Sequence, residues 1–143
     1  MPRSEQTRAL VLDTHVWLWL MEGDSRLSVP ARERLEQAVS DGNLFVSAIS
    51  VWELAMLEAK GRVTFDEDCG TWVRSALDAP GISLAPLTPE IAMASTRLPG
   101  GFHGDPADRI IAATARLNGG TVVTADKRIL SYGRTGHLAV LSA

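Results

Sequence analysis

The chain has one cysteine and no hydrophobic run long enough to cross a membrane. Cys69 has no second cysteine in the chain to pair with, which is typical of proteins of the reducing cytoplasm. The longest apolar stretch near the N-terminus, residues 9–21, is short and is interrupted by Asp13 and His15. The start of the chain also lacks the basic segment and the small-residue cleavage site of a secretory signal. We therefore expect a cytoplasmic protein that does not act at a membrane.

An excess of positive charge is also missing. The 14 Lys and Arg residues and the 17 Asp and Glu residues give a formal net charge of −3. Proteins that hold nucleic acid over their whole surface neutralise phosphates with Lys and Arg, so this chain does not fit that class. A nuclease is still compatible with this charge, because bound divalent cations invert the sign of an acidic pocket.

Basic residues in the C-terminal third could form a local rim around such a pocket, or could be ordinary surface charges. They are Arg109, Arg116, Lys127, Arg128 and Arg134. We take Arg109, Lys127 and Arg128 as the candidates for binding substrate.

The pattern of short apolar runs predicts an α/β fold. The length of 143 residues and the hydrophobic content of 45% match a single domain, 1–143, with residues 1–7 as a flexible N-terminal extension. Strands are predicted at 9–12, 44–46, 82–87, 121–124 and 138–141, and helices at 14–21, 28–39, 47–60, 67–77, from 88, and from 105 to 118. This alternation implies parallel βαβ crossovers, hence a three-layer αβα domain with a central, mostly parallel sheet of about four to five strands.

Five acids stand at the edges of apolar or weakly charged segments: Asp13, Glu53, Asp105, Asp108 and Asp126. Ligands of open parallel sheets gather at the carboxyl ends of the strands, where these acids are expected to converge. Two carboxylates about 4 Å apart repel by roughly 4 kcal/mol at an effective dielectric constant of about 20, so a cluster of them needs a cation. Oxygen ligands suit Mg²⁺ or Mn²⁺, and the sequence has no Cys/His cluster for zinc.

Each acid also has an ordinary alternative explanation. Asp13 and Asp105 stand at the starts of predicted helices and could be N-caps, and Asp126 could likewise cap a short helix. Glu53 is the only charged residue from 44 to 57, in a helix that is apolar nearly all round and is therefore predicted to be buried. An unpaired buried charge is strongly unfavourable, so Glu53 needs a salt bridge, a hydrogen-bonded proton or a metal.

Helical spacing predicts different orientations for the neighbouring acids Asp105 and Asp108. Asp108 shares a helix face with the apolar residues Ile111, Ala112 and Ala115, which are expected to face the sheet. Asp108 is therefore predicted to point inward, with Asp105 as a helix cap or an outer metal ligand.

Two polar residues lie close to these acids in the sequence. Thr124 precedes Asp126 by two residues, and its hydroxyl could orient a nearby carboxylate. We interpret His103, on a glycine-flanked loop, as a surface residue rather than a base.

Trp17 and Trp19 lie roughly 200° apart around a helix axis and cannot face the same core. Their helix is either buried within the chain or presents one face to a partner.

Four segments form a recognisable pattern: Leu-Asp-Thr-His-Val-Trp-Leu at 12–18, Ser-Ala-Ile-Ser-Val-Trp-Glu-Leu at 47–54, Phe-His-Gly-Asp-Pro-Ala-Asp-Arg-Ile-Ile-Ala-Ala-Thr-Ala at 102–115, and Val-Thr-Ala-Asp at 123–126. Read together, they resemble the PIN-domain family and, more narrowly, the VapC-type toxins of bacterial toxin–antitoxin pairs. The resemblance covers nearly the whole chain.

The resemblance implies a single-domain endoribonuclease that depends on Mg²⁺ or Mn²⁺, forms a homodimer and is held inactive by a cognate antitoxin. The family's acidic quartet would fall on Asp13, Glu53, Asp108 and Asp126, with Asp105 as an additional candidate ligand. Metal-activated water would hydrolyse the phosphodiester bonds of RNA.

Two other functions are compatible with the residues. One is a non-catalytic PIN-like module that binds RNA or protein. The other, more remote, is a phosphotransfer enzyme with Asp13 as nucleophile, although the usual partner acid two residues later is His15 here.

Overall fold

The computed structural model describes residues 8–143, and the predicted N-terminal extension, 1–7, lies outside the described residues. The strands form one parallel sheet in the order β3-β2-β1-β4-β5. Their bounds are β1 Leu10–Leu12, β2 Leu44–Ser47, β3 Ile82–Ala85, β4 Thr121–Thr124 and β5 Ala139–Ser142. The expected α/β class is confirmed, with five strands that are all parallel.

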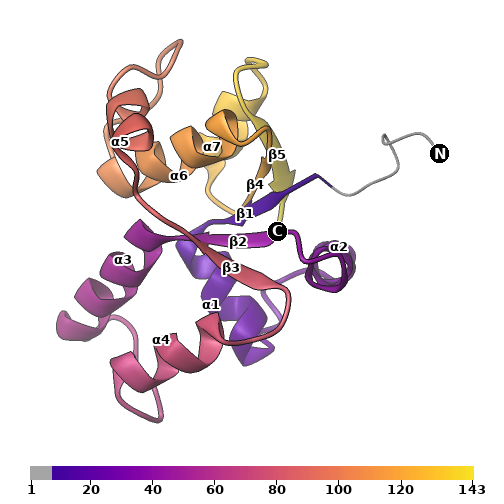
Figure 1. Cartoon of the computed structure of the whole chain (residues 1–143), viewed down its shortest axis with the longest axis vertical. Helices are drawn as coiled ribbons and strands as arrows, with labels where there is room; N and C mark the ends of the chain where they lie inside the picture. Colours follow the sequence, from indigo (N-terminus) through magenta and orange to yellow (C-terminus); the bar gives the residue numbers. More distant parts are fainter. Residues whose placement is uncertain (1–7) are drawn as a thin grey trace.

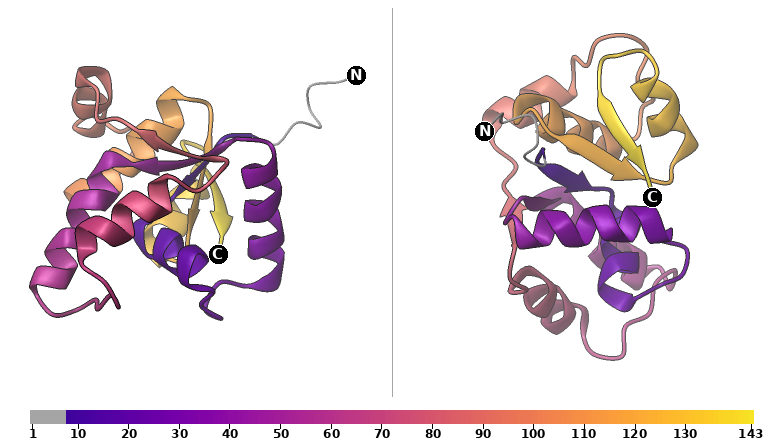
Figure 2. Two further views of the ribbon diagram at one scale, coloured as in Figure 1. Left: turned by 60° about the horizontal axis from the view of Figure 1, so that its bottom comes forward. Right: turned by 90° about the vertical axis from the view of Figure 1, so that its right-hand side faces the viewer.

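Helices cover both faces of the sheet. They are α1 Thr14–Glu22, α2 Val29–Ser40, α3 Ala48–Ala59, α4 Cys69–Leu77, α5 Pro89–Ser95, α6 Pro106–Leu117 and α7 Lys127–Gly133. Figure 1 shows the sheet in the middle of the molecule, with α6 and α7 on one side and α1, α2 and α4 on the other. The same three layers are visible from the side in Figure 2.

Element ends differ from the sequence predictions by one or two residues. The predicted strand at 82–87 ends at Ala85, because Pro86 has no N–H to offer a neighbouring strand. The predicted helix at 67–77 begins at Cys69, since the carboxylate of Asp68 accepts the N–H of Thr71 as an N-cap. The fifth strand is shifted by one residue.

The two faces of the sheet build two cores, because side chains alternate along each strand. Leu10 and Leu12 of β1 belong to a cluster with α1, α2 and α4. Val11 belongs to the other cluster, with α5, α6 and α7. The central strand is therefore buried on both faces, as its apolar run predicted. Burial on both sides holds the carboxyl end of β1 in a fixed place.

The prediction that the apolar helix around Glu53 is buried was wrong for much of its surface. α3 packs against α1, α4 and α6, but only Ser50 and Leu54 of this helix are fully buried. The indole of Trp52 is 58% exposed. An apolar helix face therefore reaches solvent beside Glu53.

The tryptophans of α1 have different surroundings. Trp17 is fully buried, and its ring meets the edge of Trp72 with 5.2 Å between centroids. Trp19 is half-buried, and the guanidinium carbon of Arg26 lies 5.2 Å from its ring centroid. Of the two alternatives, burial within the chain accounts for Trp17.

Among residues 8–143, no helix is both long and apolar enough to span a bilayer.

The exposure of α3 leads to a test with a matched pair of substitutions. Leu54→Ala should lower the free energy of unfolding by about 2–5 kcal/mol, because it leaves a cavity in the core. Trp52→Ala should change it by less than about 1 kcal/mol, since most of that side chain already contacts water. Urea unfolding of both variants measures the difference. An equal and large loss for Trp52→Ala would show that α3 is covered in solution.

Candidate active site

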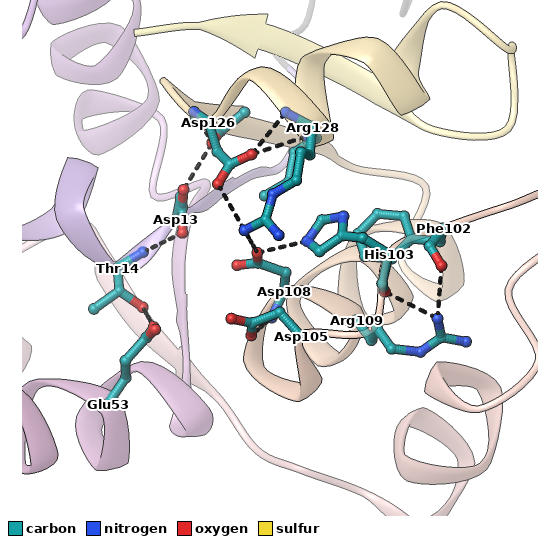
Figure 3. A network of polar contacts seen from close by, with 12 residues as sticks. Asp13, Thr14, Glu53, Phe102, His103, Asp105, Asp108, Arg109, Asp126 and Arg128 are labelled. Atoms are coloured by element: carbon teal, nitrogen blue, oxygen red, sulfur yellow. Dashed lines mark hydrogen bonds and ion pairs between the residues drawn. The ribbon is translucent and has the colours of Figure 1, made fainter.

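The acids predicted from the sequence gather at the carboxyl edge of the sheet. Asp13 directly follows β1, and Asp126 follows β4 by two residues. Glu53 lies in the second turn of α3, and Asp108 lies in the first turn of α6. Figure 3 shows their side chains directed toward a common region from four separate elements. The topology therefore brings together the expected quartet.

Both carboxylate oxygens of Asp13 accept a hydrogen bond. The N–H of Thr14 donates to Oδ1 at 2.8 Å, which makes Asp13 the N-cap of α1. The hydroxyl of Thr124 donates to Oδ2 at 2.7 Å, and it accepts the N–H of Asp126 at 2.9 Å. Thr124 thus orients a carboxylate in the way its position suggested, and it links two acids of the quartet.

The hydroxyl chain that holds Glu53 was not predicted. Thr14 donates its hydroxyl proton to Oε1 of Glu53 in a short contact. Because that proton is used, the 2.8 Å bond between Thr14 and Ser50 has the Ser50 hydroxyl as its donor. Both hydroxyl residues are fully buried. The hydroxyl side chain that directly follows Asp13 was a signal in the sequence that could have located this contact.

Asp108 faces the site, and Asp105 stands at its edge. Asp108 is 7% exposed, whereas Asp105 is the N-cap of α6 and accepts the N–H of Asp108 at 3.2 Å. Nε2 of His103 lies 2.8 Å from Oδ2 of Asp108. Interpreting His103 as an incidental surface residue was therefore wrong, because its side chain is only 15% exposed and contacts an acid of the quartet.

Arg109 builds the loop that carries His103. Its Nε donates to the carbonyl of Ser95 at 2.8 Å, and one terminal nitrogen donates to the carbonyls of Phe102 and His103 at 3.1 Å each. The rings of Phe102 and His103 stack with 4.4 Å between centroids. The guanidinium thus positions the loop, and its expected role in binding substrate stays a prediction.

Asp126 and Arg128 lie on the other side of the site. Oδ1 of Asp126 accepts the backbone N–H groups of Arg128 and Ile129, so Asp126 is the N-cap of α7. The guanidinium of Arg128 is 3.6 Å from Oδ2 of Asp126 and 4.0 Å from Oδ2 of Asp108. Both separations exceed a direct hydrogen bond.

Burial and mutual repulsion make the inner acids hard to ionise. Burial raises the pKa of Asp13, although the bonds from Thr124 and Thr14 oppose it. Burial also raises the pKa of Glu53, and the charges of Asp13 and Asp105 add to the rise.

For Asp108, burial and then the charges of Asp13 and Asp105 raise the pKa to about 6, against the bond from His103. Burial would also raise the pKa of Asp126, but the bonds from the N–H groups of Arg128 and Ile129 leave it lowered.

This donor set fits a hard divalent cation that keeps most of its water. Three carboxylates with raised pKa values lie together with a fourth, and a cation would relieve the repulsion among them. Within the described part of the chain, however, no three His, Cys, Asp or Glu side chains are placed to hold one ion directly. Mg²⁺ is commonly bound by one or two carboxylates and several waters. A site in which only one or two of these acids contact the ion directly is therefore compatible with Mg²⁺.

The raised pKa of Asp108 predicts how stability depends on pH without metal. Its folded pKa of about 6 lies above the ordinary value of 3.8 for an aspartate, so its contribution to stability is present below about pH 4 and is lost as the pH rises through 6. The shift corresponds to at most about 3 kcal/mol. Between pH 4 and pH 7 in EDTA, wild type should lose up to that much stability relative to Asp108→Asn, as measured by urea unfolding.

A control for this measurement is Asp66→Asn, which removes an exposed acid in the loop between α3 and α4. It should follow the wild-type curve. Parallel curves for wild type and Asp108→Asn would show that Asp108 ionises normally.

Comparison with known proteins identifies the family. The model of the PIN domain matches residues 10–134. The chain belongs to the PIN-domain family. It is also 37% identical over 123 residues to Ribonuclease VapC22 of Mycobacterium tuberculosis, a match that covers 86% of this chain and 91% of the relative. The resemblance to VapC-type ribonuclease toxins is thereby confirmed.

Solved structures show the same fold. The crystal structure of VapBC2 from Rickettsia felis, bound to a DNA fragment from its promoter, has a chain that matches this PIN domain with a TM-score of 0.67 and 16% identity. That match covers 93% of this chain and 97% of the other. DNA-bound VapBC from Salmonella typhimurium matches with a TM-score of 0.67 and 18% identity, over 95% and 98% of the two chains.

Proposed function

We propose that this PIN domain is a Mg²⁺- or Mn²⁺-dependent endoribonuclease and the toxin of a toxin–antitoxin pair. The observation that carries the proposal is the convergence of Asp13, Glu53, Asp108 and Asp126 at the carboxyl edge of the sheet, with three of their pKa values raised. The name of its mycobacterial relative, a ribonuclease, supports the same reaction. Asp105 is an additional candidate ligand at the rim.

The chain's own residues would position the reaction. When bound, the cation would supply a water of lowered pKa and positive charge beside the phosphate. Thr14 and Thr124 hold Asp13 between two donors, and Ser50 and Thr14 hold Glu53. Preorganised ligands of this kind need no rearrangement when substrate arrives.

The related structures support a protein partner. The matched chains belong to structures of VapBC bound to DNA, which supports a cognate antitoxin as the partner of this chain. A homodimer and a cytoplasmic location are part of the same proposal. The solvent-exposed apolar face of α3, with Trp52, is available for such contacts.

Glu53 and Asp108 give the cleanest test of the reaction, because neither is a helix cap. Glu53→Gln and Asp108→Asn should each lower the rate of RNA cleavage in Mg²⁺ or Mn²⁺ by at least about 100-fold, since even the outer partners of a metal ligand are worth about 10–100-fold. Cleavage of purified cellular RNA, followed by sequencing of the new ends, measures the loss.

The matched control is Asp68→Asn, a helix cap of α4 away from the quartet, which should cleave like wild type. A wild-type protein that binds no Mn²⁺ and cuts no RNA despite an intact fold would instead indicate a non-catalytic module.

The same substitution, Glu53→Gln, also tests whether Glu53 binds a metal or forms a structural ion pair. Its affinity for Mn²⁺ should fall, whereas its stability in EDTA should hold or rise, because one of several repelling carboxylates is gone. Calorimetric titration and thermal unfolding measure the two quantities. A large loss of stability in EDTA would mean that Glu53 serves the fold rather than a cation.

A further inference from the structure

The two sides of the acid cluster differ in charge. On the α7 side, a cavity of about 380 Å³ lies between the loop at 101–103 and α7. Its lining includes the cations Lys127 and Arg128 and the rings of Phe102, His103 and Tyr132.

On the α3 side, a second cavity of about 320 Å³ contains Glu53 and Asp105 and is otherwise apolar, with Trp52 and Met56. Of these two cavities, only the one on the α7 side has the positive charge that attracts a polyanion.

Arg128 stands where the cationic cavity meets the acids. Its side chain is 61% exposed, and its contacts with Asp108 and Asp126, at 4.0 and 3.6 Å, are too long for hydrogen bonds. Exposed ion pairs of this kind contribute little to stability, because solvent screens them. The guanidinium is thus free to exchange these weak contacts for a phosphate, which it can bind through two N–H groups at once.

The cavity has the composition of a site for one nucleotide of a single strand. The rings of Phe102 and Tyr132 meet edge to face, with 4.6 Å between centroids, and both residues line the cavity. Proteins that bind single-stranded RNA commonly place bases against aromatic side chains and phosphates against Lys or Arg.

We propose that this cavity is a subsite for a nucleotide adjoining the cleaved phosphate of single-stranded RNA, and that Arg128 binds the phosphate of that nucleotide. The inference rests on the proposed ribonuclease function and names the part of the surface that receives the substrate. It also assigns Arg128 two opposite effects: it favours RNA, and it disfavours a divalent cation beside Asp108 and Asp126.

The test compares Arg128→Ala with Arg134→Ala, an exposed arginine at the end of the same helix that does not line the cavity. Binding of a fluorescent single-stranded oligoribonucleotide is measured in the Glu53→Gln background, so that cleavage does not interfere. Arg128→Ala should weaken binding about 10-fold, and should lower the slope of log K against log salt by about 0.7, the loss of one phosphate contact. Arg134→Ala should retain the slope.

In the otherwise wild-type protein, Arg128→Ala should raise KM about 10-fold and should bind Mn²⁺ more tightly than wild type, by about threefold, because a neighbouring positive charge is removed. Equal effects of the two arginine substitutions would show a general surface charge and would overturn the subsite. So would weaker Mn²⁺ binding by Arg128→Ala.

A second variant blocks the cavity without removing charge. Ser131 lies on the exposed side of α7 and lines the cavity, so Ser131→Trp should fill it and raise KM. The control is Ser25→Trp, at an exposed position between α1 and α2 that does not line the cavity, which should leave KM unchanged. An active wild-type enzyme with unchanged KM in Ser131→Trp and Arg128→Ala would reject the subsite and leave the ribonuclease function intact. An inactive wild-type enzyme would reject the function itself.

Discussion

Burial of several carboxylates at one edge of the sheet, with their mutual repulsion added, is the constraint that shapes the rest of this molecule. Asp13, Glu53 and Asp108 are each partly or wholly withdrawn from water, and each has a raised pKa for that reason. Such a cluster opposes folding above its pKa range unless a cation joins it. The fold therefore accepts a cost in stability at the place where the proposed chemistry needs negative charge.

Hydroxyl donors keep two acids of the cluster in position. The hydroxyls of Thr14 and Thr124 hold the carboxylates of Glu53 and Asp13 without adding positive charge beside them. Lysine or arginine at those places would lower the pKa values more strongly, but would also compete with a divalent cation. Within residues 8–143, Arg128 is the arginine whose guanidinium comes within 4.0 Å of a quartet carboxylate, and it makes only long contacts and is mostly exposed.

The site and the helices depend on the same residues. Asp13, Asp105 and Asp126 are N-caps of α1, α6 and α7, as their ordinary explanation predicted, and two of them also belong to the proposed quartet. Capping and ligand placement are therefore compatible, because the free N–H groups of a helix start fix a carboxylate beside the end of a strand. Glu53 and Asp108 have no cap role.

The sequence by itself determined the class of fold and the order of all elements except α7, because apolar periodicity and helix caps are local signals. It also singled out the candidate acids, and the resemblance to the PIN-domain family proposed four of them as a quartet. It also determined that Asp108 turns inward, since helical spacing sets the face of a side chain.

Only the tertiary structure decided which residues meet. The bonds of Thr124 to Asp13 and of Thr14 to Glu53 join residues far apart in the chain, and the contact of His103 with Asp108 depends on a loop that Arg109 shapes. The exposure of Trp52 likewise depends on which helices cover α3. The sequence pattern of a single helix does not predict which other helices pack against it.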